Sequence, residues 1–234
     1  MTRIIVTDIT AFSNNTKVCI AGIQQETGQC IRPMPYLEEE NCRNLDIFPG
    51  TILEGKFAAT HSITAPHSED LWHRGLAPVG QLSNSDFRNV LLSSCSGSVQ
   101  DGFGHPLGGN EKSYCAQNPP AVSLITISIP AKTLCFRMDK YRAGRAKVSF
   151  CDRAGFLGQW YNFLPVADLG IRDFLSSGEI NTQCDILNAF FHSQTEVVLR
   201  IGLGRIHEEK YWMQVNGFYS FPTYCPYVRR ATGY

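Results

Sequence analysis

The feature that most constrains this chain is the alternation of apolar and polar residues in positions 196–224, EVVLRIGLGRIHEEKYWMQVNGFYSFPTY. Every second residue from 197 to 203 is aliphatic, and every second residue from 211 to 221 is apolar or glycine. Two period-2 runs joined by a short polar segment, 204–210, predict a β-hairpin. One face of this hairpin suits a core. The other face carries Arg200, Trp212, Gln214 and Asn216, which we expect to contact a ligand.

The length of 234 residues allows one large domain or two small ones of about 110 residues each. A hydrophobic content of 43% supports a packed core. No apolar run reaches the roughly 18 residues that a membrane span needs. The first residues, MTRIIVTDITAF, lack the layout of a signal peptide. We therefore expect a soluble cytoplasmic protein with no membrane partner.

The nine cysteines are widely spaced and include no C-x-x-C pair, which argues against a zinc ribbon or a thioredoxin-like site. We interpret them as small buried hydrophobic residues in a reducing compartment. The alternative, a catalytic thiol, has no supporting local motif.

Charge is distributed unevenly between the two halves, although the net charge is zero. Residues 1–118 contain 8 basic and 12 acidic side chains, whereas residues 119–234 contain 13 basic and 9 acidic ones. Such asymmetry indicates nucleic-acid contact by the basic half. The near-neutral total favours a small ligand or a few nucleotides over a long duplex.

The second half has the element order of a five-stranded Greek-key barrel with a helix between strands three and four. Strands are predicted at 122–129, 147–152 and 156–163, followed by a short helix at 168–177 and then the hairpin. Asp168 and Gly178 provide the helix with an N-cap and a C-terminal stop.

The first half fits the same plan less completely. Its strands are predicted at 3–8, 17–24, 30–33 and 51–60, with a weak helix at 37–45. The next segment, 61–74, is irregular, so a fifth strand is not evident, and strand 122–129 could serve either barrel. Ser83 and Asp86 resemble a capping box that starts a helix over 83–94.

The loop 95–120, rich in Gly, Ser and Asn, is the predicted domain boundary. The fold class is therefore mainly β, with two tandem OB-like small β-barrels and short helices. The N-terminal barrel with a helix and loop insertion spans 1–118, and the C-terminal barrel spans 119–234.

Several segments resemble the dual OB-domain proteins of prokaryotes. These segments are IIVTDIT, KVCIAGI and TGQCIRPMPYL near the start, PHSED in the middle, and LRIGLGR and YWMQVNGFYSFP at the end. The resemblance implies two tandem barrels and a role in nucleic-acid or nucleotide recognition in antiviral defence or mobile-element conflict. Its motif positions here are Arg32, His67, Glu69, Asp70, Arg205, Gln214 and Asn216.

A basic run over 137–153 is the main candidate for nucleic-acid contact. Its Arg142, Arg145 and Lys147 precede Trp160, and basic grooves with stacked aromatic side chains are how such barrels bind single strands. The alternative is a solvated charged hairpin beside core aromatics. Arg205 ends the first strand of the hairpin and could fork onto a phosphate or form a structural ion pair.

His67, Glu69 and Asp70 form a second candidate cluster, with His61 and His73 nearby. Imidazole and carboxylate groups could bind a divalent metal or supply an acid and a base for phosphodiester cleavage. The spacing matches no standard zinc signature. The alternative is a loop whose carboxylates cap turns or pair with arginines such as Arg32.

We therefore predict a non-catalytic module that recognises single-stranded nucleic acid or a nucleotide, without a cofactor. Two alternatives remain: a metal-assisted nuclease or phosphodiesterase that uses His67, Glu69 and Asp70, and an interaction subunit with a protein partner. The predicted ligand-binding residues are Arg32, Arg142, Arg145, Lys147, Trp160, Arg200, Arg205, Trp212, Gln214 and Asn216.

Overall fold

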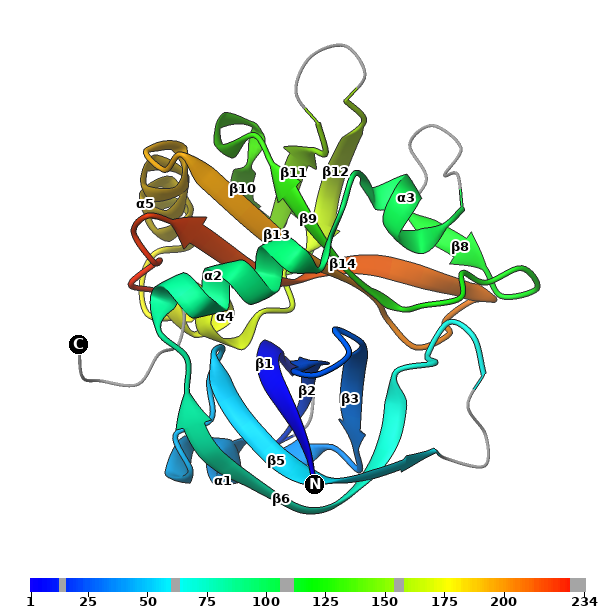
Figure 1. Ribbon diagram of the computed structural model, residues 1–234. Coiled ribbons are helices and arrows are strands. Elements are labelled where there is room, and N and C mark those ends of the chain that lie inside the picture. Colours follow the sequence, from blue (N-terminus) through cyan, green and yellow to red (C-terminus); the bar gives the residue numbers. More distant parts are fainter. Residues whose placement is uncertain (13–15, 60–63, 106–111, 154–157, 228–234) are drawn as a thin grey trace.

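The computed structural model describes residues 1–12, 16–59, 64–105, 112–153 and 158–227. It is mainly β, with one closed five-stranded barrel from the first half and one open half-barrel from the second, so the predicted fold class is confirmed. Figure 1 shows the blue and cyan first barrel lying against the green-to-red second one. We call the contact region between them the seam.

The first barrel closes because its first strand pairs with two partners, β2 and β5. β2 continues to β3, β3 pairs in parallel with β6, and β6 pairs with β5. A short strand, β4, and a one-turn helix, α1, lie between β3 and β5 in the chain. The bounds are β1 Thr2–Ala11, β2 Lys17–Gln24, β3 Cys30–Met34, β4 Leu37–Glu38, α1 Glu39–Asn44, β5 Thr51–Ala59 and β6 Asp70–Gln81.

Strand β6 is the fifth strand that the sequence did not reveal. The segment predicted to be irregular, 61–74, contains its first five residues, and positions 60–63 lie outside the described residues. Gly75, Pro78 and Gly80 interrupt any period-2 pattern, and every residue of β6 is exposed or half-buried. The register against β5 also shifts twice, which is typical of β-bulges.

The second half repeats the cyclic strand order of the first. Its first strand is split by a 3-10 turn into β9, which pairs with β13, and β10, which pairs with β11. β12 pairs with β11, and Val166, the residue directly after β12, forms a parallel bridge with Val215 of β14. The bounds are β9 Leu124–Ile129, η1 Ala131–Thr133, β10 Cys135–Met138, β11 Ala146–Cys151, β12 Trp160–Pro165, α4 Leu169–Ser176, α5 Ile180–His192, β13 Glu196–Leu203 and β14 Lys210–Phe221.

The hairpin of β13 and β14 is present as predicted, but its second face is not open. Almost all of β13 and the C-terminal two thirds of β14 are buried, because one face lies on the second core and the other approaches the first barrel. The hydroxyl of Tyr219, for example, donates to the backbone carbonyl of Thr7 on β1.

Two of the three main helices begin directly after the N-cap residues that the sequence predicts. Ser83 caps α2, Asn84–Ser93, by accepting from the Asp86 N–H, and Asp168 caps α4 by accepting from the Ile171 N–H. Helix α5 was not predicted from the sequence. Its buried side chains recur at helical spacing, and Asn188 hydrogen-bonds the backbone N–H and C=O of Phe136, which protects the edge strand β10.

The described parts of the segment 84–115, which are residues 84–105 and 112–115, pack on the second half. Its elements are α2, β7 Cys95–Ser96, α3 Val99–Phe103 and β8 Ser113–Cys115. β7 pairs with β9, β8 pairs with β14, and Phe87 and Phe103 belong to the core of the second half. The domain boundary at 118 stays a prediction. The elements of this segment precede residue 118 in the chain, yet they pair and pack with the second half.

Candidate functional site

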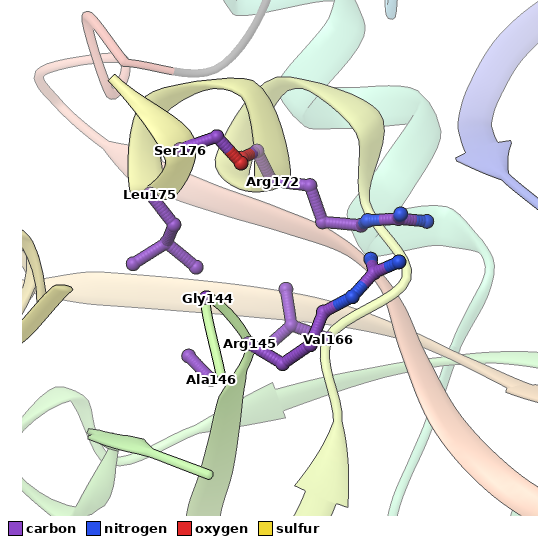
Figure 2. Close-up of a pocket in the computed structure, with 7 residues that line it drawn as sticks. All are labelled: Gly144, Arg145, Ala146, Val166, Arg172, Leu175 and Ser176. Atoms are coloured by element: carbon purple, nitrogen blue, oxygen red, sulfur yellow. The ribbon is translucent and has the colours of Figure 1, made fainter. Parts of the chain in front are cut away.

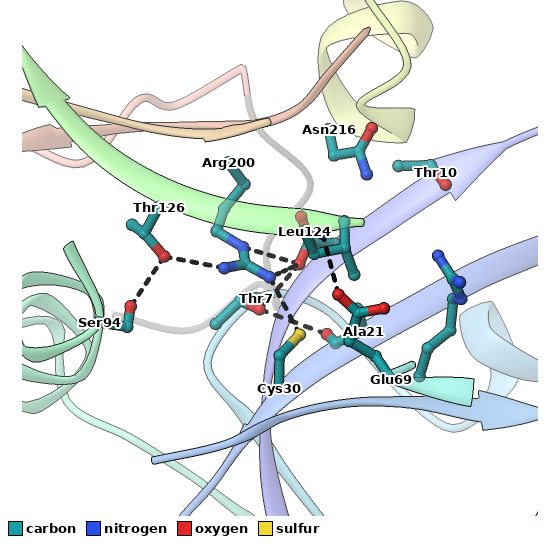
Figure 3. A network of polar contacts seen from close by, with 12 residues as sticks. Thr7, Thr10, Ala21, Cys30, Glu69, Ser94, Leu124, Thr126, Arg200 and Asn216 are labelled. Atoms are coloured by element: carbon teal, nitrogen blue, oxygen red, sulfur yellow. Dashed lines mark hydrogen bonds and ion pairs between the residues drawn. The ribbon is translucent and has the colours of Figure 1, made fainter. Parts of the chain in front are cut away.

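Six of the predicted site residues lie at the seam, where five are buried or half-buried and the sixth, Arg205, is exposed. They are Arg32, His67, Glu69, Asp70, Arg200 and Arg205. They come from β3, from the segment leading into β6 and the first residue of β6, and from β13 and the residues after it. Together they form a polar network between the two barrels, and Figure 3 labels two of them, Arg200 and Glu69.

Arg200 is the most deeply buried cation of this network, with 1% of its surface exposed. Its Nε donates to Asp8 Oδ2 at 2.9 Å, its Nη1 donates to Thr126 at 2.8 Å, and its Nη2 lies 3.4 Å from the Cys30 sulfur. Figure 3 shows the guanidinium between Thr126 and Cys30. Arg200 therefore joins the barrels and does not reach a surface ligand.

Glu69 fastens the start of the second barrel to the first. Its Oε1 accepts from the backbone N–H of Ser123 at 2.7 Å and of Leu124 at 3.0 Å, and its Oε2 accepts from the Ser123 hydroxyl at 3.0 Å. Burial raises the pKa of Glu69, and these donors and the Arg32 charge oppose the shift. Its oxygens thus face protein donors.

Arg32, His67 and Asp70 complete the network. The Arg32 guanidinium donates to Asp70 and, at 2.8 Å, contacts His67 Nδ1. Burial, reinforced by the charges of Arg32 and Arg205, lowers the pKa of His67 to about 3, so the imidazole is neutral. Arg205 donates to Asp70 at 2.8 Å and to the Tyr36 hydroxyl at 2.6 Å.

These contacts indicate a structural role, because they connect the two barrels to each other. In the part of the chain that the structure describes, no group of three or more His, Cys, Asp or Glu side chains is placed to hold a metal ion. His61 lies outside the described residues, and His73 lies on β6 with its Nε2 3.3 Å from the Pro35 carbonyl. At the seam, Glu69 and Asp70 accept hydrogen bonds from protein donors. The alternative interpretation of this cluster, in which its carboxylates cap turns or pair with arginines such as Arg32, predicts contacts of this kind.

The other predicted residues gather elsewhere. Arg142, Arg145, Lys147 and Gln214 line one hollow of about 200 Å³, together with Arg172 of α4. A second hollow of about 240 Å³ adjoins it and shares Arg145 and Arg172 (Figure 2). We call these two hollows the basic cleft. Among its described lining residues, Asp139 is the single carboxylate.

The loop between β10 and β11 presents these cations. The Asp139 N–H donates to the Arg145 carbonyl at 2.7 Å, and the Asp139 carboxylate accepts from the Tyr141 N–H at 3.0 Å. Gly144 takes a left-handed φ of 70°, which permits the tight return of the chain. The loop is thereby shaped so that Arg142 and Arg145 line the cleft and Tyr141 is 94% exposed.

A third hollow, of about 440 Å³, adjoins the cleft through Asp139 and Lys147 and is partly aromatic. It is lined by Tyr141 and Phe163, with Lys112 placed 5.4 Å from the Phe163 ring centroid. We call it the aromatic hollow.

Phe163 is turned outward by a local irregularity. It adopts a φ of 59° where the register of β12 against β11 shifts, and its N–H donates to the Ser149 hydroxyl. Bulges re-aim side chains, and left-handed non-glycine residues concentrate at functional sites. As a result, Phe163 is 50% exposed and Trp160, on the same strand, is 52% exposed.

The remaining candidates, Trp212 and Asn216, do not line the basic cleft. Trp212 is partly exposed at the start of β14, donates to the His207 carbonyl, and lies under Lys210. Asn216 is buried and accepts from Gln214.

The sequence reasoning missed Arg172, Lys112, Tyr141 and Phe163. Tyr141 was detectable because it lies inside the basic run. Arg172 lies on a separate helix, and Lys112 just before β8, so no local pattern connected them to the run.

Comparison of the chain with known protein families, curated proteins and solved structures finds no match. Within the described residues, no helix combines the length and the apolar character needed to cross a membrane.

Proposed function

We propose that the second barrel binds single-stranded nucleic acid through the basic cleft and the aromatic hollow. The observation that carries the proposal is the composition of the cleft: four cationic side chains, Arg142, Arg145, Lys147 and Arg172, surround a hollow whose described lining includes one carboxylate. Such a concentration of like charge is unfavourable by itself and becomes favourable when phosphate groups neutralise it.

The charges around the cleft are largely uncompensated. Lys147 lies 3.6 Å from Asp139, while no ion pair of Arg142 or Arg145 occurs among the described residues. Burial, and the nearby charge of Lys147, lower the pKa of Lys112. The contribution of Lys147 indicates a local excess of positive charge, which an anion would relieve.

The aromatic hollow supplies the second element of single-strand recognition. Tyr141 and Phe163 present exposed rings beside the cations, and Trp160 extends the same strand. Stacking of a base on an aromatic side chain contributes roughly 1–3 kcal/mol and does not depend strongly on sequence.

The position of the basic cleft and the aromatic hollow within the second barrel supports the same proposal. Five-stranded barrels of this order bind oligonucleotides on strands two and three and on the loop between strands one and two. In the second half these are β11, β12 and the loop 139–145, which contribute Lys147, Phe163 and Tyr141 to the site.

The expected salt dependence is moderate. Neutralising about four phosphates of a single strand gives a slope of log K against log salt of roughly −3. This fits a ligand of a few nucleotides and the zero net charge of the chain.

Fluorescence anisotropy with an internally labelled ten-nucleotide strand, at two salt concentrations, tests the proposal. The double variant Arg142→Gln/Lys147→Gln should weaken binding and reduce the salt slope by about 1.4. Phe163→Ala should weaken binding roughly 5- to 150-fold without changing the slope. Arg74→Gln, an exposed arginine on β6 of the first barrel, is the matched control. Absence of wild-type binding at both salt concentrations, or equal binding by all variants, would refute the proposal.

The resemblance to dual OB-domain proteins supports the same proposal and adds a role in bacterial defence against mobile elements. Phage plating on bacteria that express the wild-type chain or the double variant tests this part. Equal plating efficiency with wild-type chain and with empty vector would remove it.

A further inference from the structure

The end of the basic cleft next to α4 differs from the rest of it. Arg145 of the loop and Arg172 of α4 both line the two hollows, and their guanidinium groups lie next to each other and extend in the same direction (Figure 2). Burial lowers the pKa of Arg172, and the charge of Arg145 lowers it further, against the opposing charges of Asp173 and Glu39. Two cations are therefore held together at one point.

The carboxylates nearest to Arg172 already have another partner. Asp173 pairs with Arg43 at 3.0 Å, and Glu39 pairs with the same guanidinium. Arg172 Nη1 donates to the Ala11 carbonyl at 2.7 Å, which fixes the direction of the side chain. Arg145 has no side-chain partner among the described residues. The arginine pair is thus positioned, and neither guanidinium forms an ion pair with a carboxylate among the described residues.

The surroundings strengthen the effect of these charges. Val166 and Leu175, both buried, form apolar walls beside the pair. Electrostatic interactions are stronger where nearby apolar groups exclude water. Guanidinium groups also match the geometry of phosphate oxygens by forming two parallel hydrogen bonds.

The negative charge of a phosphate group decides which kind of phosphate best matches the two arginines. An internal phosphodiester carries one negative charge, whereas a phosphate monoester carries about −1.5 to −2 at pH 7 and offers three acceptor oxygens. Two adjacent guanidinium groups are matched by the monoester.

We propose that Arg145 and Arg172 bind a phosphate monoester, either the terminal phosphate of a strand or that of a nucleotide. This inference rests on the proposed function, because it places the end of the bound strand at α4. The bases then extend past Lys147 toward Tyr141 and Phe163.

The test uses ten-nucleotide strands that carry a 5′-phosphate, a 3′-phosphate or hydroxyl groups at both ends, with the full chain and anisotropy as the readout. One phosphorylated strand should bind at least 10-fold more tightly than the hydroxyl-ended strand. Arg172→Gln and Arg145→Gln should each reduce this ratio below 3-fold, whatever they do to overall affinity. Arg142→Gln should weaken all three strands while preserving the ratio.

Thermal unfolding of each variant controls for folding. Arg172→Gln removes a contact with the first barrel, whereas Arg145→Gln removes no described side-chain contact and remains informative if Arg172→Gln unfolds.

The outcomes separate the two proposals. If hydroxyl-ended strands bind but neither phosphate improves binding more than 2-fold, the monoester site is refuted and strand binding stands. If no strand binds but thymidine monophosphate binds calorimetrically and Arg172→Gln abolishes this, the monoester site stands and strand binding is refuted. If neither ligand binds, both are refuted.

Discussion

Replacing Arg200 by methionine should destabilise the protein by about 3–5 kcal/mol, because it leaves the buried carboxylate of Asp8 without its partner. The side chains of both residues are 2% exposed. After the substitution, the described partner of the Asp8 carboxylate is the Thr7 hydroxyl, which donates to Oδ2, while Oδ1 has no described partner even in the wild type.

Differential scanning calorimetry measures this effect. For a chain of this length, 1 kcal/mol shifts Tm by about 2–4 °C, so the variant should melt roughly 6–20 °C below the wild type. The double variant Arg200→Met/Asp8→Asn should recover at least half of the loss, since no unpaired charge remains. Recovery by the second substitution separates loss of the ion pair from poor packing of methionine.

Arg74→Met on the exposed side of β6 is the control and should change stability by less than about 0.5 kcal/mol. If Arg200→Met melts within 2 °C of the wild type, the ion pair does not hold the seam together. Arg200 would then lack the structural role that its contact with Asp8 indicates.

Three further predictions concern caps and titrating groups. Ser83→Ala should lower stability by about 1 kcal/mol in urea unfolding, because α2 loses its N-cap; an unchanged midpoint would contradict this. Burial raises the pKa of Asp168 from 3.8 to about 7, so the wild type should lose stability relative to Asp168→Asn as pH rises from about 4 to about 7. Calorimetry at pH 5 and pH 8 checks this, and a Tm difference that does not grow with pH would refute it. Burial lowers the pKa of His67 from 6.5 to about 3, so stability should fall as pH drops below about 6.5. The variant His67→Gln should lose less stability than the wild type over that pH range. If the free energies of urea unfolding of the two proteins fall in parallel with pH, His67 is not responsible for the loss.

Elements with strong local signals could be predicted from the sequence. Strand β2 occupies the predicted residues 17–24, and the hairpin has its turn where the polar segment interrupts the alternation. Ser83 and Asp168 act as caps because a cap depends on a few adjacent residues.

Features that depend on distant partners could not be predicted. β6 lacks alternation because no face of it is fully buried, so its pairing with β5 and β3 determines it. The structural role of Arg200 could not be predicted from the sequence for the same reason. The alternation placed it on a polar face, but that face is covered by the first barrel, whose Asp8 lies 192 residues away in the chain.

The candidate site was partly predictable for a related reason. Arg142, Arg145 and Lys147 lie within six residues of one another, so the fold carries them to one hollow as a group. Arg172 joins them because α4 crosses beside the loop, which is a property of the tertiary structure.

The two barrels share a strand order but present their third strands differently. β3 of the first barrel carries Arg32, which contacts Ser123 of the second half, whereas β12 exposes Trp160 and Phe163. The second half therefore occupies the face of the first barrel that corresponds to the proposed binding face. If the proposed function holds, the two barrels of one chain have a single face free for a strand, and a titration with short strands should saturate at one strand per chain.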